Sequence, residues 1–184
     1  MAVLLIVAAA AVVLLFLVFG LYNTCVRLRN RVKNAWSQID VQLKRRYDLV
    51  PNLVECVKKY MAHERETLTA VTEARSACMR SQGVKEQAQA ENMLTGALKT
   101  LFAVSEAYPQ LKADQNMMQL QEELTATENR IGFARQHYND SVMQYNTHIQ
   151  TVPAVFIAGL FRFEEAEFFE LESAAERQVP KVQF

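Results

Sequence analysis

The stretch NAWSQIDVQLKRRYDLVPNLVE (34–55) decides the fold, because its apolar residues recur at the alternating three- and four-residue spacing of a helix that packs on other helices. The pattern extends beyond this stretch, and most positions of its two seven-residue series are apolar. The series are Trp36, Leu43, Val50, Val57, Glu64, Val71 and Cys78, and Asp40, Tyr47, Val54, Met61, Leu68 and Arg75. Pro51 removes one backbone donor and should bend the helix without ending it. We therefore expect one helix from about Val3 to Arg80.

Toward the N-terminus the helix continues into AVLLIVAAAAVVLLFLVFGL (2–21), which has no charged side chain. A helix of this length spans about 30 Å, the thickness of the hydrocarbon core of a bilayer. A signal peptide is the alternative, but it would need a basic first part, a shorter apolar part and a small-residue cleavage site. Only Met1 precedes the apolar run, and Leu21-Tyr22-Asn23 is a poor cleavage site. The sequence therefore predicts a retained transmembrane anchor over residues 1–22.

Basic residues outnumber acidic ones in the segment that follows the anchor. The positive-inside rule then predicts a single-pass protein of the inner (cytoplasmic) membrane, with its N-terminus outside and its C-terminal body in the cytoplasm. The basic residues nearest the anchor are Arg27, Arg29, Arg31 and Lys33. We expect these four side chains to contact anionic headgroups of the lipid bilayer. The alternative is that they only set the topology and recognise no specific lipid.

The remaining chain also shows helical spacing, interrupted by short breaks. Ser81-Gln82-Gly83 supplies a stop, since Gly83 can adopt a positive φ. The segments expected after it are a helix from Val84 to Ala107, a helix from Leu111 to Thr151, an apolar segment from Ala154 to Phe163, a short acidic helix from Glu164 to about Arg177, and the tail PKVQF. Short connections imply antiparallel neighbours. The sequence thus predicts an all-α fold, in which an N-terminal transmembrane helix (1–22) continues into an antiparallel bundle of long helices (23–151), followed by the C-terminal segment (152–184).

Composition and motifs argue against catalysis, metal binding and nucleic-acid binding. The chain has 20 Lys and Arg against 20 Asp and Glu, whereas nucleic-acid binders carry a basic excess. His63-Glu64 begins like the zinc motif HExxH, but residue 67 is Thr, so the second histidine is missing. The three cysteines show no CxxC spacing, and no glycine-rich phosphate loop is present. We therefore expect a protein that is not an enzyme and has no metal or cofactor.

Three charged residues, Asp40, Glu64 and Arg75, occupy positions in the series where an apolar residue is usual. One interpretation places them at the margin of the apolar face or in pairs with Arg130 and Arg135 of the third helix, where charges fix the register of a bundle. The other is a functional polar cavity. The sequence does not decide between these two interpretations.

Several blocks of the chain closely resemble the LemA family. They are NAWSQIDVQLKRRYDLVPNLVE (34–55), HERETL (63–68), TEARS (72–76), ATENRI (126–131), ARQHYNDSVMQYN (134–146) and IAGLFRFEEAEFFE (157–170). The resemblance implies an antiparallel bundle of long helices and a cytoplasmic body, but no biochemical activity is established for the family. Some members are thought to act beside membrane proteases in envelope quality control. Arg162 stands where the family pattern has glycine, which puts close packing at that turn in doubt.

A first helix that reached Arg80 would leave the apolar face between Trp36 and Val54 without a partner in the same chain. An exposed apolar face of that length favours self-association. The candidate contact residues are Trp36, Leu43, Arg45, Arg46, Tyr47 and Val50 on the first helix and Phe156, Leu160 and Phe161 in the apolar segment. The apolar segment is too short to span a membrane, and its length suits a buried, a re-entrant or an interfacial piece. It could instead pack against the end of its own bundle.

Two functions follow as hypotheses. The first is a membrane-anchored homo-oligomer that forms a scaffold and shapes or organises the membrane. The second is an adaptor that binds another envelope protein, for example in quality control linked to a membrane protease. The sequence supplies no partner and no stoichiometry for either.

Overall fold

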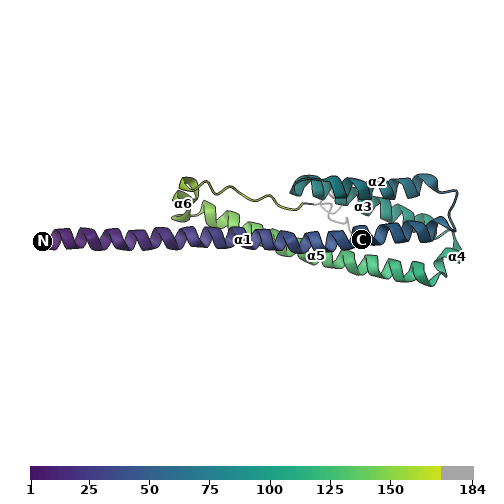
Figure 1. Ribbon diagram of the computed structural model, residues 1–184, viewed down its shortest axis with the longest axis horizontal. Helices are drawn as coiled ribbons and strands as arrows, with labels where there is room; N and C mark the ends of the chain where they lie inside the picture. Colours follow the sequence, from purple (N-terminus) through teal and green to yellow (C-terminus); the bar gives the residue numbers. More distant parts are fainter. Residues whose placement is uncertain (171–184) are drawn as a thin grey trace, which may run out of the picture. The chain divides into compact units, whose positions relative to one another are not determined.

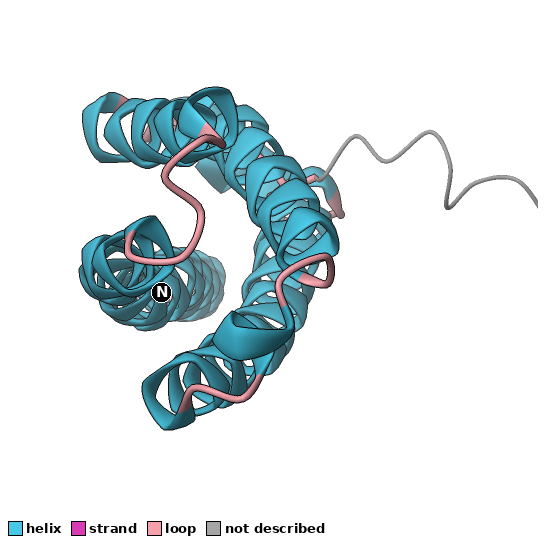
Figure 2. Cartoon of the chain, turned by 90° about the vertical axis from the view of Figure 1, so that its right-hand side faces the viewer, coloured by secondary structure: helices cyan, strands magenta, loops and turns pink. Residues whose placement is uncertain are grey.

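The computed structural model describes residues 1–170, and these residues form helices and connecting loops without a strand (Figures 1 and 2). The helices are α1 (Ala2–Lys58), α2 (Arg65–Arg80), α3 (Val84–Ser105), α4 (Pro109–Lys112), α5 (Gln115–Gln150) and α6 (Ala154–Leu160). The prediction of an all-α fold, with a long apolar N-terminal helix followed by a helical bundle, is confirmed.

The chain forms two compact units, and α1 and α5 each contribute to both. The anchor unit contains residues 1–40 and 133–168, and the bundle unit contains residues 41–132 together with Phe169 and Glu170. In each unit α5 runs antiparallel beside α1. The rings of Trp36 and Tyr138 lie 5.4 Å apart in the anchor unit. In the bundle unit, Tyr60 just beyond α1 donates a 2.9 Å hydrogen bond to Asp114 just before α5.

The expectation of one helix from Val3 to Arg80 is wrong, because α1 ends at Lys58 and α2 begins at Arg65. The backbone N–H groups of Tyr60 and Met61 both bond to the carbonyl of Val57, 3.0 Å away, and close the helix there. Apolar spacing continues across this turn because α1 and α2 both present buried residues to the core of the bundle unit. No glycine or proline marks the turn, so the sequence carried no signal for it.

The shorter α1 overturns the argument that its apolar face lacks a partner. Ile39, Leu43, Val50 and Leu53 are at most 2% exposed within the single chain. The next helices in the bundle unit, α2 and α3, pack against each other (Figure 1). The face between Trp36 and Val54 is therefore part of the protein core.

Pro51 lies inside α1, and the helix continues past it as expected. A helical carbonyl normally accepts from the N–H four residues later, so proline at position 51 leaves the carbonyl of Tyr47 without its donor. Arg75 of α2 replaces that donor, and its Nε lies 2.7 Å from the Tyr47 carbonyl oxygen. The charged residue in the apolar series thus repairs a defect that a proline causes in the neighbouring helix.

This repair predicts an interaction between Arg75 and Pro51. Arg75→Met should lower the free energy of unfolding by about 1.5–3 kcal/mol, because it removes a charge-assisted hydrogen bond to a half-buried carbonyl. In a Pro51→Ala background, position 51 regains its N–H, and the same substitution should cost about 1 kcal/mol less. Denaturant unfolding of the four proteins measures this coupling, with Arg80→Met at an exposed arginine of α2 as the control. Equal costs in the two backgrounds would contradict the repair.

Asp114 holds the start of α5. Its Oδ1 accepts from the backbone N–H groups of Asn116 and Met117, at 2.9 and 3.1 Å, and its Oδ2 accepts from Tyr60. The carboxylate therefore caps the helix and ties it to the end of α1. The hydrogen bonds from Tyr60 and then from Met117 lower the pKa of Asp114 below its ordinary value of 3.8.

A lowered pKa in the folded state means that the unfolded chain binds the proton more readily. Asp114 therefore stabilises the fold above its unfolded pKa, and this contribution is lost as the pH falls through the folded pKa. Asp114→Asn keeps an acceptor oxygen but no charge. We expect the variant to melt at a lower temperature than wild type at neutral pH, and the difference to shrink on acidification. A difference that stays constant down to strongly acidic pH would show that the charge has no role.

The short acidic helix expected from Glu164 is wrong for residues 164–170, which are extended; the rest of it and the tail PKVQF lie outside the described residues. Residues 163–168, here called the strap, lie along α5. Side chains of α5 bond to the strap backbone: Tyr145 to the carbonyl of Glu164 (2.8 Å), Tyr138 to that of Glu167 (2.8 Å), and Asn146 to both the carbonyl and the N–H of Ala166 (2.9 Å each). These bonds satisfy backbone groups that a helix would have paired internally.

Candidate functional site

The bundle unit contains a buried cluster of polar side chains centred on Arg46 of α1, which is 4% exposed. Its Nη1 lies 3.1 Å from Glu91 of α3 and 2.9 Å from Glu128 of α5, and its Nη2 donates to Thr95 of α3 at 2.9 Å. A guanidinium withdrawn from water needs this number of acceptors, since an unpaired buried charge is very costly. Arg46 therefore joins three helices at one point.

Tyr47 extends the polar cluster toward α2. Its hydroxyl donates to Glu91 and accepts from Gln87 Nε2 at 2.7 Å, and Gln87 accepts from Ser81 at 2.6 Å. Burial, together with the negative charge of Glu91, raises the pKa of Tyr47 far above its usual range. Burial raises the pKa of the neighbouring Cys78 thiol to about 12, so that it stays protonated and is a poor nucleophile.

The polar cluster is built as a joint between helices. The donors of Arg46 and Gln87 are directed to acceptors of the protein itself, and the charges that meet there are those of Arg46, Glu91 and Glu128. Among residues 1–170, no group of three or more His, Cys, Asp and Glu side chains is placed to hold a metal ion. The arrangement can fix the register of the helices.

The sequence singled out two members of this cluster, Arg46 and Tyr47, but as contacts between copies. Both are buried inside one chain, as are Leu43 and Val50, while Arg45 is exposed and Trp36 is half-buried against Tyr138. The sequence analysis did not identify Gln87, Glu91 and Glu128. A signal was present for the first two, because Gln87 and Glu91 continue the helical stripe of buried residues that includes Leu94, Leu98 and Leu101.

Two of the three charged residues of the apolar series, Glu64 and Arg75, are bonded within the bundle unit. Glu64 accepts from the hydroxyl of Tyr108 at 2.9 Å, and Arg75 donates to the Tyr47 carbonyl. Their partners therefore lie on the α3–α4 connection and on α1, not on the arginines of α5. This favours the interpretation that they fix the register of the bundle.

Adjacent arginines provide a matched test of the polar cluster. Arg46→Ala should lower the free energy of unfolding by about 3–5 kcal/mol, because it leaves the buried carboxylate of Glu91 unpaired. Arg45→Ala, one residue earlier and exposed, should change it by no more than about 0.5 kcal/mol. Denaturant unfolding measures both. Similar small costs for the two variants would show that the cluster contributes little to stability.

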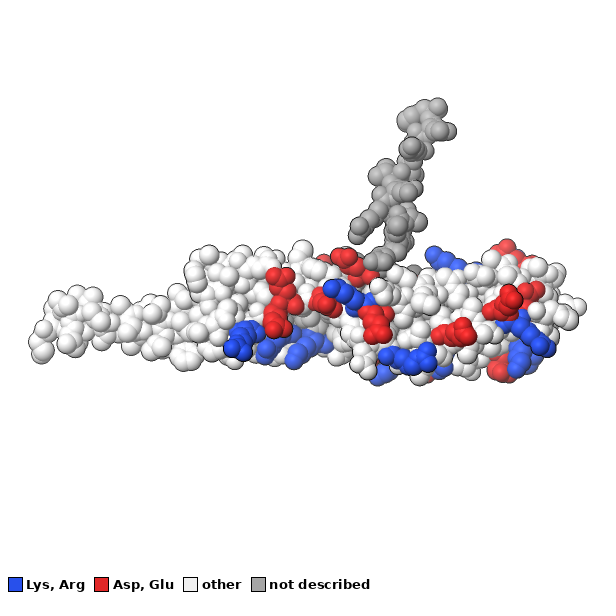
Figure 3. All heavy atoms as spheres, turned by 90° about the horizontal axis from the view of Figure 1, so that it is seen from above, with Lys and Arg blue, Asp and Glu red and all other residues white. Residues whose placement is uncertain are grey.

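The anchor unit presents a different surface. The side chains of residues 3–7 and 12–17 of α1 are largely exposed, and α1 is long and apolar enough to cross a membrane. The space-filling view shows this uncharged segment followed at once by a group of basic side chains (Figure 3). The coarse prediction of an apolar N-terminal anchor agrees with the structure, whereas its orientation stays a prediction.

The four basic residues nearest the anchor, Arg27, Arg29, Arg31 and Lys33, are all exposed. The guanidinium of Arg29 lies 5.1 Å from the ring centre of Phe163, and Arg31 donates to Gln144 of α5 at 3.1 Å. These contacts hold two of the four side chains near the strap and α5. Contact with lipid headgroups stays a prediction for all four.

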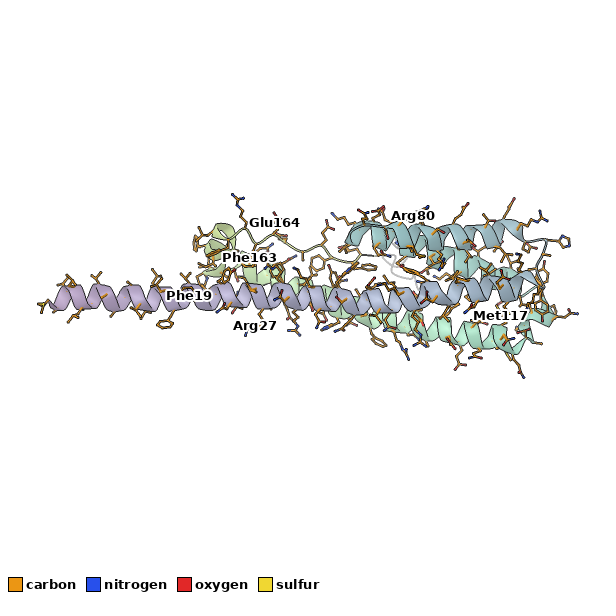
Figure 4. The ribbon with its side chains drawn as sticks, viewed as in Figure 1. Phe19, Arg27, Arg80, Met117, Phe163 and Glu164 are labelled. Carbon is orange, nitrogen blue, oxygen red and sulfur yellow. The ribbon has the colours of Figure 1, made fainter. Side chains whose placement is uncertain are left out.

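The remaining self-association candidates belong to α6 and its end. Phe156, Leu160 and Phe161 are 71%, 72% and 49% exposed. The ring of Phe161 lies 4.8 Å from that of Tyr22, and Figure 4 shows Phe163 beside α1 between Phe19 and Arg27. The structure thus places Phe161 and Phe163 beside the end of the apolar N-terminal segment.

Comparison with known proteins covers most of the chain. The model of the LemA family matches residues 35–184. Protein LemA of Metamycoplasma hominis is 29% identical over 141 residues, which cover 74% of this chain and 63% of that protein. Magnetosome proteins MamQ 1 and MamQ 2 of Paramagnetospirillum magneticum are each 24% identical over 184 residues, which cover 86% of this chain and 68% of the relative. The chain therefore spans about two thirds of the length of these relatives.

Proposed function

The chain belongs to the LemA family, and from this premise we propose that it is a membrane-anchored, non-enzymatic helical protein that self-assembles into a scaffold at the membrane. In this proposal α1 crosses the bilayer once, with the N-terminus outside and the helical body in the cytoplasm. The scaffold organises or shapes the membrane in which many anchors lie side by side.

The main support for this proposal is the distribution of exposed apolar side chains. Large exposed apolar side chains form a continuous group along residues 3–19 and recur at α6, both in the anchor unit. Elsewhere in the described chain they are scattered, which is usual for a protein surface. The polar residues of the bundle unit are directed to each other, as described for Arg46 and Tyr47. This distribution supports a role at the membrane rather than a reaction inside the bundle.

Contacts between copies would have to use surface that one chain leaves exposed. The buried face of α1 is unsuitable, since its residues pack inside the chain. The anchor is suitable, because the four small residues Ala8–Ala11 allow transmembrane helices to approach closely. Relatives named as magnetosome proteins also support a role in a larger cellular structure.

An adaptor for another envelope protein is the second candidate. It is favoured by the exposed charged residues Arg45 and Asp48, which lie on α1 in a family-like block and are not covered by the fold. An adaptor would bind its partner through such charges and would itself remain a monomer.

Particle size distinguishes these two functions. We expect the full-length protein, extracted in mild detergent or placed in lipid, to form uniform oligomers in electron micrographs and in light scattering. A uniform monomer under all conditions would overturn the scaffold and leave the adaptor as the better hypothesis.

Charge reversal sharpens the comparison. If the exposed side of α1 that carries Arg45 lies between copies, Arg45→Glu should change the size of the oligomer. If the protein is an adaptor, the variant should remain a monomer but no longer bind its partner. Arg130→Glu, at an exposed arginine of α5 in the same unit, is the control. Arg46→Glu is uninformative, because a carboxylate beside Glu91 in the core would unfold the protein.

A further inference from the structure

Helix α6 is apolar on both its covered and its uncovered side. Ala154, Ile157 and Ala158 face the protein and are at most 8% exposed. The opposite side carries Phe156 and Leu160, which are 71% and 72% exposed and lie four residues apart, one turn of the helix. Val152, just before the helix begins, is 76% exposed. No charged residue occurs between Thr151 and Phe161. A surface helix in water would carry polar residues on its outer side, so water is an unsuitable surrounding for α6.

The position of α6 is fixed relative to the anchor, because both belong to the anchor unit. Tyr22, which directly follows the apolar stretch, contacts the rings of Phe161 and Phe163 at centroid distances of 4.8 and 5.7 Å. The anchor is already partly buried one turn before Tyr22, since Val18 is half-buried whereas Leu17 is 47% exposed. The end of α6 therefore lies beside the last turn of the segment that crosses the bilayer.

The backbone of α6 is suited to an apolar surrounding. Phe161, Arg162 and Phe163 donate their N–H groups back to the carbonyls of Ile157, Gly159 and Ala158, at 3.0, 3.4 and 2.9 Å. This closure requires Arg162 to adopt a φ of 55°, a conformation that glycine takes more readily. The turn therefore explains why the family pattern has glycine at the position of Arg162. The turn also satisfies backbone carbonyls that cannot be left unpaired in lipid.

Charged residues begin directly after α6. Arg162 and Glu164 are exposed, and Arg29 stacks over Phe163 on the same side of the anchor's end. An apolar helix followed by aromatic rings and then by charges has the order of layers found at a membrane surface, from acyl chains to headgroups.

We propose that α6 inserts its Phe156 and Leu160 side, together with Val152 just before the helix, into the bilayer beside the anchor, as a second, non-spanning membrane contact. This rests on the part of the proposed function in which α1 spans the membrane, and it does not depend on self-assembly. The bilayer is favoured over a second copy of the chain as the occupant, because Phe161 at the end of α6 contacts Tyr22, which directly follows the apolar run, so that lipid around the end of the anchor also borders α6. The two contacts fix how the anchor unit stands on the membrane, which a single helix alone leaves free to tilt and rotate.

Three phenylalanines of nearly equal exposure allow a direct test. Phe16 in the anchor and Phe133 on α5 are both 74% exposed, and Phe156 on α6 is 71% exposed. Phe133 lies in the anchor unit close to Tyr138, whose partner Trp36 is about 14 residues, or roughly 21 Å, beyond Tyr22 along α1. Trp36 is the single tryptophan of the chain, so each Phe→Trp substitution is made in a Trp36→Phe background that keeps an aromatic ring against Tyr138.

The full-length proteins are placed in vesicles of phosphatidylcholine and phosphatidylglycerol with brominated acyl chains, and tryptophan fluorescence is compared with that in unbrominated vesicles. Acrylamide in the buffer then reports access from water. We expect Phe16→Trp and Phe156→Trp to lose most of their fluorescence to the brominated lipid, and Phe133→Trp to lose it only to acrylamide. Leu160→Trp, at a site 72% exposed, should behave like Phe156→Trp.

Three results would overturn the inference. Quenching of Phe156→Trp and Leu160→Trp by acrylamide alone, with Phe16→Trp quenched by lipid, would place α6 in water and leave the anchor intact. Protection of both α6 variants from lipid and from acrylamide would show that protein, such as a second copy, covers this side. Absence of lipid quenching at Phe16→Trp would remove the anchor itself and with it the basis of both proposals.

Discussion

The bundle unit depends on one constraint, which is that the guanidinium of Arg46 is withdrawn from water and must find its acceptors in the protein. Glu91 and Thr95 on α3 and Glu128 on α5 meet this demand, and each bond holds only at one register of the helices. The next residue, Tyr47, links α1 to α2. Its carbonyl has no helical donor, because Pro51 lacks an N–H, and it accepts a hydrogen bond from Arg75 instead. A charge and a proline on one helix thus determine where its neighbours lie.

The same need for satisfied polar groups shapes the anchor unit. The strap is extended, so its backbone groups require partners outside itself, and Tyr138, Tyr145 and Asn146 of α5 provide them. The spacing agrees with simple geometry. Seven residues of helix between the two tyrosines span about 10.5 Å, and three residues of extended chain between their acceptors span about 10 Å. Side chains of α5 can therefore donate hydrogen bonds to these two carbonyls without bending of α5 or of the strap.

These two arrangements bear on function. The polar residues that could have suggested chemistry are used to hold helices and the strap together, whereas uncovered apolar surface is grouped in the unit that contains the anchor. A member of the LemA family with this distribution of surface is suited to act at a membrane, through what its anchor unit contacts. The scaffold and the adaptor are alternative proposals on that common ground, and the insertion of α6 is independent of the choice between them.

The sequence by itself determined the helical fold, the apolar N-terminal helix and the family, because helical periodicity, an uninterrupted apolar run and long specific blocks are local properties of the chain. It did not determine where the first helix ends, because α1 and α2 share one apolar rhythm and no breaker separates them. It also placed Arg46 and Tyr47 on an outer face and missed Glu91, since a buried polar residue can be told from an exposed one only when its partners on other helices are known. The strap shows the same limit: residues 164–170 look helical when read alone and are extended because α5 offers bonds to their backbone. Tertiary structure decided which polar groups meet, and that in turn decided which surfaces are left exposed.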